Sequence, residues 1–429
     1  MNSGEPLRLR GAVHAVQLFP MSAFAAGNGA PIISGTSDAP FKQGTGGSNS
    51  FRIPAMVTLS DGTLVAAADA RWNTTYDGGG LDTMVAVSRD NGATWEHSFA
   101  NYLGDNGNQY NGGSSSCFID PALAVLTRDE NNDGIGEDTI YMLCDLYPNG
   151  VALNGDGHQI APDLSTGFNA SGNLKLTTMA PTTYIDGDFT HYLDGDKIYT
   201  NDGAVVEGLT VDAWFNVTGI YNGQTVNSNL FFADSPFHVA RTGYLYLTRS
   251  TDGGASWSAP QLLNLKTNQE MVCLVGPGRG IVTYKGDQPC IVFPIYSYNG
   301  SNDSQRTGFI YSDDEGATWN RVDSTVSWSS ESAVVELWDS TLRFFYRNGS
   351  SQLKYVDYTW DGGWGTPQTT GIATNSNTQI SAISLLKTVD DRQVILVSCP
   401  AGPSGGSNQS GASYRTNGKI FLFTVDENT

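Results

Sequence analysis

Residues 88–95 read SRDNGATW, residues 250–257 read STDGGASW and residues 312–319 read SDDEGATW. All three fit the pattern S-x-D-x-G-x-[ST]-W, and each follows an alternating apolar run that is typical of a β-strand. In such a box the Asp side chain accepts hydrogen bonds from turn amides, while the Trp packs beside the hairpin. A worn fourth copy is expected at 356–360, VDYTW. The repeat predicts one hairpin tip of the same design in each of several sheets.

The spacing of the boxes indicates a β-propeller with an insertion. Small sheets that cannot bury their own faces are expected to pack side by side as propeller blades. The second and third boxes start 62 residues apart, whereas the first and second start 162 residues apart. The extra length falls in residues 150–237, where the Asp-Gly turns of YIDGD, YLDGD and TNDGA separate strand-like runs. We therefore expect a propeller over 49–429 that carries a small inserted β lobe over 150–237.

The composition supports a β-rich fold and argues against several partners. The 429 residues include 50 Gly, 9 Trp, 19 Tyr and 18 Phe, which is typical of many short strands joined by turns. The net charge of −20 argues against nucleic acid and anionic membranes, because both need a basic patch. A small anionic ligand would instead need a local arginine cluster. No run of 18 apolar residues stands in the sequence, so no transmembrane segment is expected.

The N-terminal residues are expected to lie outside the fold. Residues 1–48 are rich in Gly, Ser, Ala and Pro after a weak apolar run, which predicts a leader or linker. Residues 8–26, RLRGAVHAVQLFPMSAFAA, resemble a signal peptide. A secreted or cell-surface protein is therefore expected.

Neither the cysteines nor the acidic clusters demand a cofactor. The five cysteines lack metal-binding spacing; Cys117 and Cys144 are either neighbours or, as the more frequent case, separate buried thiols. Asp129–Asp133 resembles the start of a calcium loop, but Ile140 stands where the bidentate Glu is needed. A structural calcium ion and a solvated hairpin turn both stay open there, and no cofactor is required.

Charged residues stand at both ends of a predicted hairpin within 51–77, FRIPAMVTLSDGTLVAAADARWNTTYD. Arg52 opens the first strand, Ser-Asp-Gly at 60–62 forms the turn, and Asp77 lies in the polar loop after the second strand. Taken alone, each charge would be solvated at the surface. Together, an arginine and an aspartate just outside apolar strands can meet at one end of a sheet.

The FRIP sequence and the repeated boxes together resemble the sialidases (neuraminidases), in particular bacterial exo-α-sialidases with an inserted β lobe. The resemblance covers residues from about 50 to 429, and the boxes alone would not be specific, because other propellers contain them. It implies a six-bladed propeller with Asp-box hairpins. It also implies a secreted or cell-surface bacterial glycoside hydrolase that removes terminal α-linked sialic acid from glycans, glycoproteins or gangliosides.

The resemblance assigns the central site residues one by one. Arg52, Arg347 in LRFFYRNG and Arg415 in SYRTNGKIFLF match three arginines that bind the substrate carboxylate. Asp77 matches the acid/base aspartate, and Glu331 in SSESAVVEL matches the glutamate beside the nucleophile. Three further residues fall where the sialidases line the sugar pocket: Arg71, Asp120 and Gln305.

The implied chemistry explains these residue types. A planar guanidinium group binds a carboxylate in a forked, charge-assisted way that lysine cannot copy. A carboxylate nucleophile would be repelled by the carboxylate of sialic acid, and sialidases use a tyrosine instead. The glutamate takes the tyrosine proton, the aspartate protonates the leaving oxygen, and the configuration is retained.

The sequence departs from the family pattern at the nucleophile. The family places that tyrosine well beyond the third arginine, whereas the chain ends at Thr429, only 14 residues after Arg415. A truncated chain with an incomplete last blade is the favoured explanation. A sialic-acid-binding protein without catalysis, and a last blade completed by the N-terminal segment, are the alternatives. This chain alone is therefore expected to hydrolyse α-sialosides very poorly.

A different product is compatible with the same site. The inserted lobe permits an intramolecular trans-sialidase, which would form an anhydro sugar. Aromatic residues of the lobe above the pocket would favour it, and the candidates are Tyr184, Tyr192 and Trp214. Linkage preference and oligomeric state do not follow from the sequence.

Overall fold

The computed structural model describes residues 29–72, 77–104, 116–129, 136–153, 162–180, 188–301, 304–348, 352–374, 378–389, 392–400 and 417–426. Within these ranges the protein is built from β-strands, with one short 3-10 helix, η1, Thr45–Gly47. The predicted all-β class is confirmed. In the described part of the chain, no helix has the length and apolar character needed to cross a membrane.

Five groups of mostly antiparallel strands form the body of the molecule. The first group contains β1 (Ser50–Thr58), β2 (Leu64–Arg71), β3 (Leu81–Ser88) and β4 (Glu96–Asn101). The second contains β5 (Cys117–Arg128), β6 (Glu137–Tyr147), β14 (Tyr244–Ser250) and β15 (Gln261–Leu263). The third contains β16 (Val272–Val275), β18 (Ile281–Lys285), β19 (Gln288–Tyr298), β20 (Arg306–Ser312) and β21 (Asn320–Asp323). The fourth contains β22 (Ser329–Glu336), β23 (Leu342–Asn348), β24 (Gln352–Thr359), β25 (Gly363–Trp364) and β26 (Gln368–Ala373), and the fifth contains β27 (Ser381–Val389), β28 (Arg392–Pro400) and β29 (Gly418–Val425).

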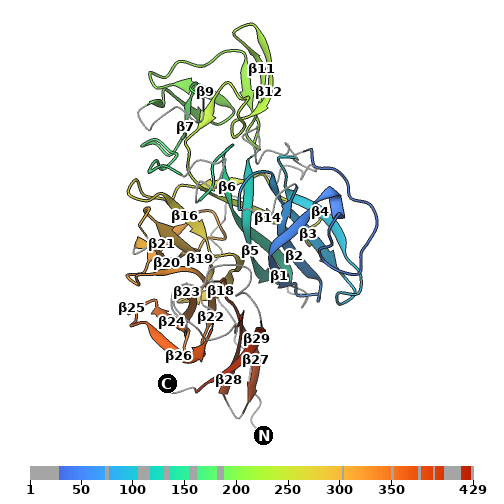
Figure 1. Ribbon diagram of the computed structural model, residues 1–429, viewed down its shortest axis with the longest axis vertical. Helices are drawn as coiled ribbons and strands as arrows, with labels where there is room; N and C mark the ends of the chain where they lie inside the picture. Colours follow the sequence, from blue (N-terminus) through green and yellow to red (C-terminus); the bar gives the residue numbers. More distant parts are fainter. Residues whose placement is uncertain are drawn as a thin grey trace.

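The groups follow one another in chain order through the body of the molecule (Figure 1). A parallel bridge between Leu81 and Cys117 joins the first two groups, and the short strand β17 (Gly278–Arg279) pairs with β5. β17 also contacts β1 and β22, so the first strands of three groups meet around it. The described residues supply five groups, and the expected count of six blades stays a prediction.

The predicted hairpin of 51–77 is present in the first group. β1 and β2 pair from Ser50↔Arg71 to Thr58↔Leu64, and the amide of Thr63 donates to Asp61 Oδ1 over 2.8 Å in the turn. The expectation of a leader over 1–48 does not hold for its last part. Residues 29–48 pack on the first group, where Ser37 pairs with Trp95 in a β-bridge.

Two small sheets form the inserted lobe, and all of their strands except the last, β13 (His238–Val239), fall within the expected range 150–237. One contains β7 (Leu174–Thr177), β8 (His191–Asp194), β9 (Lys197–Thr200) and β13 (His238–Val239), and the other contains β10 (Leu209–Val211), β11 (Asn216–Tyr221) and β12 (Gln224–Asn229). The lobe lies at one end of the molecule, next to β6 and β14 (Figure 1). The buried Lys266 anchors its base, because its ammonium group donates to the carbonyls of Asp163 (2.9 Å) and Ser165 (2.6 Å).

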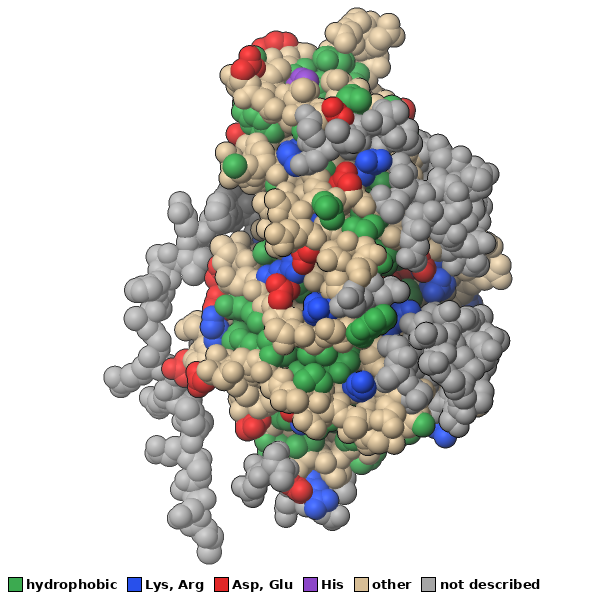
Figure 2. Space-filling view, turned by 60° about the vertical axis from the view of Figure 1, so that its left-hand side comes forward, with side chains coloured by type: hydrophobic (Ala, Val, Ile, Leu, Met, Phe, Trp, Pro, Cys, Tyr) green, Lys and Arg blue, Asp and Glu red, His purple; other side chains and the backbone are tan. Residues whose placement is uncertain are grey.

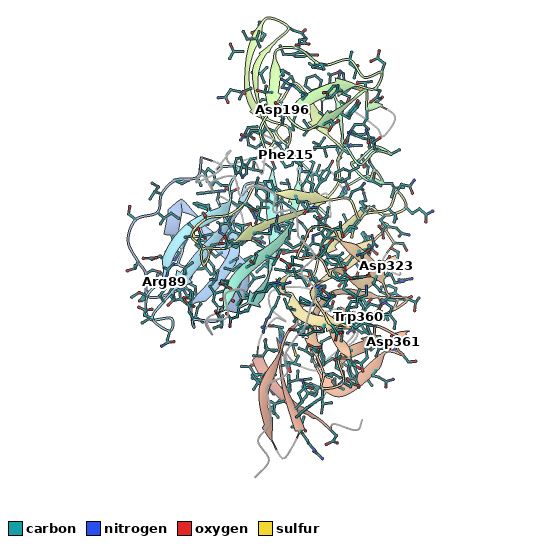
Figure 3. All side chains as sticks on the ribbon, turned by 180° about the vertical axis from the view of Figure 1, so that it is seen from behind. Arg89, Asp196, Phe215, Asp323, Trp360 and Asp361 are labelled. Carbon is teal, nitrogen blue, oxygen red and sulfur yellow. The ribbon has the colours of Figure 1, made fainter. Side chains whose placement is uncertain are left out.

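The three boxes form one and the same hydrogen-bonded turn. In the first, Asp90 Oδ1 accepts from Ser88 Oγ and from the amide of Thr94, each over 2.8 Å. The corresponding Asp252 and Asp314 accept equivalent bonds. In the first group this turn lies away from the lobe, as the places of Arg89 and Phe215 show (Figure 3).

The expected fourth copy of the box is wrong. Asp357 lies inside β24 and does not cap a turn; its carboxylate accepts two bonds of 2.8 Å from Arg343. The strand continues past it to Thr359, so the chain turns only afterwards. The cysteines, in contrast, follow the more frequent alternative, because all five are buried free thiols.

Candidate active site

The first strands of three groups each carry a bulge near their start. The pairing is interrupted over 53–54 in β1, over 120–121 in β5 and over 330–331 in β22. Ile53 and Asp120 have positive φ angles of 54° and 61°, and each precedes a proline, which cannot donate to the ladder. A bulge re-aims side chains out of a ladder. The three bulges present Arg52, Asp120 and Glu331 near the starts of their strands.

The first ion-paired group connects the core to the surface through four side chains. Arg71 and Asp69 are fully buried neighbours on one face of β2, with Nη2 and Oδ2 2.6 Å apart. The other terminal nitrogen of Arg71 donates to Asp77 Oδ1 over 3.0 Å. Arg52 donates to the same oxygen over 2.9 Å. Asp77 is 60% exposed and Arg52 33% exposed, so this end of the group is open to a ligand.

Asp69 is a residue that the sequence reasoning missed. Its Oδ1 accepts the backbone N–H of Asp120 over 2.9 Å, so one carboxylate fixes Arg71 and the bulge of β5 together. Burial raises the pKa of Asp69 to about 6, and Arg71 opposes that rise. A single acid within the apolar run VAAADA was the available signal.

The second ion-paired group of side chains joins β22 and β23, the first two strands of the fourth strand group. Arg347, near the end of β23, donates to both oxygens of Glu331, over 3.0 and 2.9 Å. The Glu331 side chain is 12% exposed and that of Arg347 26% exposed. Burial raises the pKa of Asp120 well above its ordinary value, and the charges of Asp69 and Glu331 raise it further. Asp120 is therefore within electrostatic reach of one carboxylate from each ion-paired group.

A buried acid and two buried tyrosines complete the surroundings, and the sequence reasoning named none of them. Asp145, at the end of β6, accepts the amide of Val275 over 3.1 Å, and burial raises the pKa of its carboxyl well above the ordinary value. Tyr147 ends β6, Tyr296 lies near the end of β19, and both are buried in one apolar cluster. Burial raises the pKa of both phenols well above their usual value, and the charge of Glu331 raises that of Tyr296 further. Both phenols are therefore neutral near pH 7.

Several predicted residues lie elsewhere or outside the described ranges. Gln305 is half-buried before β20, and its side chain forms no hydrogen bond with the other site residues described. Arg415 and Tyr184 fall outside the described residues, so their assignments stay predictions. Tyr192 stacks on Tyr199 within the lobe, with ring centres 5.5 Å apart.

The calcium prediction also remains open. Residues 130–135 of the proposed loop are outside the described ranges. Elsewhere in the described chain, no three His, Cys, Asp or Glu side chains form a group suited to a metal ion. Acidic and basic side chains are interspersed on the face drawn in Figure 2.

The arrangement is suited to a small carboxylate ligand. Arg52 and Arg347 come from two sheets, and each has a partly exposed guanidinium held by a carboxylate. Arginine forks bind carboxylates with charge-assisted bonds, and a partly buried site screens them little. Asp77 supplies an exposed carboxyl group beside them, as general acid chemistry requires.

Comparisons with known proteins agree with this geometry. A family model for a BNR repeat-like domain matches residues 223–417. The anhydrosialidase of Macrobdella decora is 30% identical, over 89% of this chain and 52% of that protein. Sialidase B of Streptococcus pneumoniae is 28% identical, over 83% of this chain and 54% of that protein. The chain thus spans about half the length of these curated relatives.

Solved structures show the same relationship. The intramolecular trans-sialidase from Ruminococcus gnavus, in complex with oseltamivir carboxylate, has a TM-score of 0.68 at 25% identity and covers 89% of this chain and 86% of that one. The leech intramolecular trans-sialidase, in complex with 2,7-anhydro-Neu5Ac, has a TM-score of 0.70 at 26% identity and covers 89% of this chain and 62% of that one. Fold, sequence and domain matches agree, and the chain resembles bacterial-type sialidases over most of its length.

Proposed function

We propose that the protein binds terminal α-linked sialic acid on glycoconjugates and releases it with retention of configuration. The observation that carries the proposal is a pair of partly exposed arginines that are each ion-paired with a carboxylate. Arg52 pairs with Asp77, and Arg347 pairs with Glu331. Both guanidinium groups bind the carboxylate of sialic acid, and Arg415 is the proposed third. A six-bladed propeller with Asp-box hairpins is the fold proposed for this function.

The carboxyl groups have different roles in this proposal. Asp77 is exposed and donates its proton to the leaving oxygen of the glycosidic bond. Glu331 is largely buried against Arg347 and serves as the base for a tyrosine nucleophile. Arg71 and Asp120 line the sugar pocket, both held by Asp69. These roles follow from the family resemblance, and the contacts in the structure support them.

A second candidate is intramolecular transfer, in which a hydroxyl group of the bound sialic acid takes the place of water. The relatives favour it, because an anhydrosialidase and two intramolecular trans-sialidases are among the matches. The product would be an anhydro sugar in place of free sialic acid. A third candidate is binding without turnover.

Product analysis separates these candidates. The full chain is incubated with 3′-sialyllactose, and the products are identified by mass spectrometry as free sialic acid, an anhydro sugar or neither. The expectation of very slow hydrolysis is tested in the same assay with a chromogenic sialoside. Calorimetry measures binding independently of turnover.

A matched pair of variants tests the site itself. Arg347→Ala is expected to abolish sialoside binding, because it removes the guanidinium and leaves Glu331 unpaired. Arg392→Ala removes an exposed arginine at the start of β28, which pairs with Asp426 just after β29, and binding should be unchanged. The proposal fails if the wild-type chain binds no sialoside, or if Arg347→Ala binds as tightly as the wild type.

A further inference from the structure

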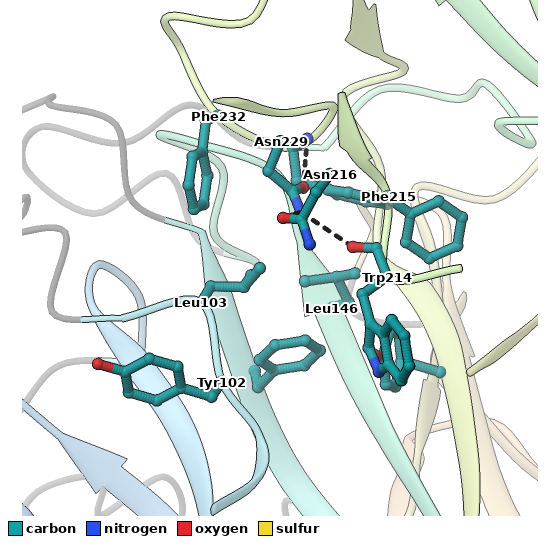
Figure 4. Close-up of a pocket in the computed structure, with 11 residues that line it drawn as sticks. Tyr102, Leu103, Leu146, Trp214, Phe215, Asn216, Asn229 and Phe232 are labelled. Atoms are coloured by element: carbon teal, nitrogen blue, oxygen red, sulfur yellow. Dashed lines mark hydrogen bonds between the residues drawn. The ribbon is translucent and has the colours of Figure 1, made fainter. Parts of the chain in front are cut away.

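A hollow with a cavity volume of about 90 Å³, open to solvent, lies between the lobe and the second strand group (Figure 4). One side of the hollow is formed by β5, β6, β14 and the residues just after β4. The other side is formed by the residues around the start of β11 and the end of β12, which lie together at the open end of that hairpin. The lining side chains are Tyr102, Leu103, Phe118, Leu146, Trp214, Phe215, Asn216, Asn229, Phe231, Phe232 and Tyr246.

The floor of the hollow is rigid and apolar. Phe118 and Tyr246 are buried and pack edge to face, with ring centres 4.8 Å apart. Phe231 is also buried and packs against Phe215, with centres 5.4 Å apart. Close packing of this kind holds side chains in place. The hollow is therefore a formed feature and needs no rearrangement to accept a ligand.

The turn that carries Trp214 is held in a strained conformation. Phe215 has a φ angle of +66°, which bulky residues rarely adopt. The carboxylate of Asp212 accepts the amides of Trp214 (2.8 Å) and Asn216 (2.9 Å), and Asn229 Nδ2 donates to the Trp214 carbonyl over 2.9 Å. Such strain persists only where surrounding bonds enforce it, and it is concentrated at binding and catalytic sites.

The chemistry of the lining selects a neutral, amphipathic ligand. Seven of the eleven residues are aromatic and none is charged, so an ion would lose water without gaining a counter-charge. Only Asn216 and Asn229 offer side-chain amides. Asn216 Oδ1 accepts from Asn229 over 3.0 Å and Asn216 Nδ2 donates to Asp212 over 2.9 Å, which leaves each of these two atoms capacity for one further bond. A pyranose ring fits this pattern, because its C–H face packs on aromatic rings while its hydroxyl groups need polar partners.

The hollow is connected to the ion-paired groups. Leu103 donates its amide to Asp82 over 2.8 Å, and the other oxygen of Asp82 accepts Trp72 Nε1 over 2.9 Å. Trp72 directly follows Arg71 in the chain, and its ring lies 6.3 Å from that of Tyr102. On the other side, Phe118 stands two residues before Asp120 on β5. Hollow and candidate active site thus lie at the same end of the first two groups.

We infer that this hollow is a subsite for the neutral hexose units of the glycan that carries the sialic acid, with Trp214 as the ring on which a hexose stacks. The inference rests on the proposed function, since the sialic acid itself occupies the arginine site. It adds a second recognition element, which would select glycans by the sugars that precede the sialic acid.

Equilibrium binding to the full chain tests the inference without requiring turnover. The ligands are 3′-sialyllactose, methyl α-sialoside, which lacks the hexoses, and lactose alone, with calorimetry as the readout. Trp214→Ala is expected to lower the affinity for 3′-sialyllactose about tenfold and to leave the affinity for methyl α-sialoside unchanged. The matched control is Trp338→Ala, because Trp338 is 42% exposed between β22 and β23 and does not line the hollow. This control should bind both ligands as the wild type does.

The outcomes distinguish the inference from the proposed function. If Trp214→Ala leaves 3′-sialyllactose binding unchanged, or weakens both sialosides equally, the subsite is refuted while the arginine site stands. If the wild type binds no methyl α-sialoside, the proposed function fails. Lactose then decides the subsite alone: binding that Trp214→Ala removes supports it, and absent or unaffected lactose binding refutes it.

Discussion

The carboxylates beside the arginines organise the site at the scale of single residues. Two guanidinium groups that converge on one ligand would repel each other in its absence. Asp77 neutralises Arg52, and Glu331 neutralises Arg347, so both arginines are fixed before a ligand arrives. An arriving carboxylate needs only to compete for the exposed faces of these groups, which limits the entropy lost on binding.

Asp69 should act as a positioning residue for sialoside binding. Asp69→Asn removes the charged partner of the buried Arg71, so we expect affinity for methyl α-sialoside to fall about tenfold at pH 7.5. Because the pKa of Asp69 is raised to about 6, wild-type affinity should also fall as the pH drops through 6. The variant lacks this group and should lack that step. Calorimetry between pH 5 and 7.5 measures both effects.

An exposed aspartate provides the control for this substitution. Asp196→Asn changes a side chain of the lobe turn between β8 and β9, and both affinity and its pH profile should match the wild type. Equal affinities of Asp69→Asn and wild type across the pH range would contradict the positioning role.

Asp145 should make the folded protein less stable as the pH rises. Its pKa is raised by burial, so the folded state keeps the proton after the unfolded chain has lost it near pH 4. Stability then falls with pH by at most about 1.4 kcal/mol per unit from this group, up to its folded pKa. Asp145→Asn carries no titrating proton. Urea unfolding at pH 5, 6, 7 and 8 should show the variant gaining stability relative to the wild type as the pH rises toward the folded pKa of Asp145, and parallel curves would count against a neutral Asp145.

Sequence reasoning named the charged residues that stand beside recognisable motifs and missed the buried Asp69. Arg52, Asp77, Glu331 and Arg347 stand beside recognisable motifs, and the structure pairs Arg52 with Asp77 and Glu331 with Arg347. Asp69 was overlooked because its partners are Arg71 and an amide of another strand, and neither follows from local pattern. A lone acid in an apolar run signals burial but not what it binds.

The bulges are the structural devices that matter at the scale of elements. The sequence F-x-x-P occurs at 51–54 and again at 118–121, and both copies form a bulge with a positive φ angle. This second repeat was a usable signal, because proline marks an interrupted ladder. The box repeat predicted hairpin tips correctly where Asp and Gly both stood. It failed at 356–360, where the Asp lies in strand register opposite Arg343.

The aspartate of a box should stabilise its hairpin measurably. Asp314→Ala removes an acceptor of three hydrogen bonds, from Ser312 Oγ and from the amide and hydroxyl of Thr318. We expect a loss of about 1–3 kcal/mol in the free energy of unfolding, measured by urea denaturation. The adjacent Asp313→Ala is the matched control, because Asp313 forms only a partly exposed ion pair with Lys285. Equal losses for the two variants would show that the turn bonds contribute little.

At the scale of the whole molecule, the residues of the proposed site come from more than one sheet. Arg52, Arg71 and Asp77 belong to the first group, Asp120 to the second, and Glu331 and Arg347 to the fourth. The repeat spacing predicted the body and the lobe, since both follow from the order of elements along the chain. The hollow beside Trp214 did not follow, because it depends on how the lobe packs on β5, β6 and β14.

A ligand that spans these groups should stabilise the molecule and not only its binding loop. At a concentration one hundred times its Kd, a sialoside that binds only the folded state adds about 2.7 kcal/mol to the free energy of unfolding. Because Arg52 and Arg347 lie on different sheets, hydrogen exchange should slow in both β1–β2 and β22–β23 on addition of methyl α-sialoside. Arg347→Ala should lose both the stabilisation and the protection. Protection confined to β1–β2 in the wild type would mean that the ligand is held by the first group alone, and that the two ion-paired groups do not act on one carboxylate.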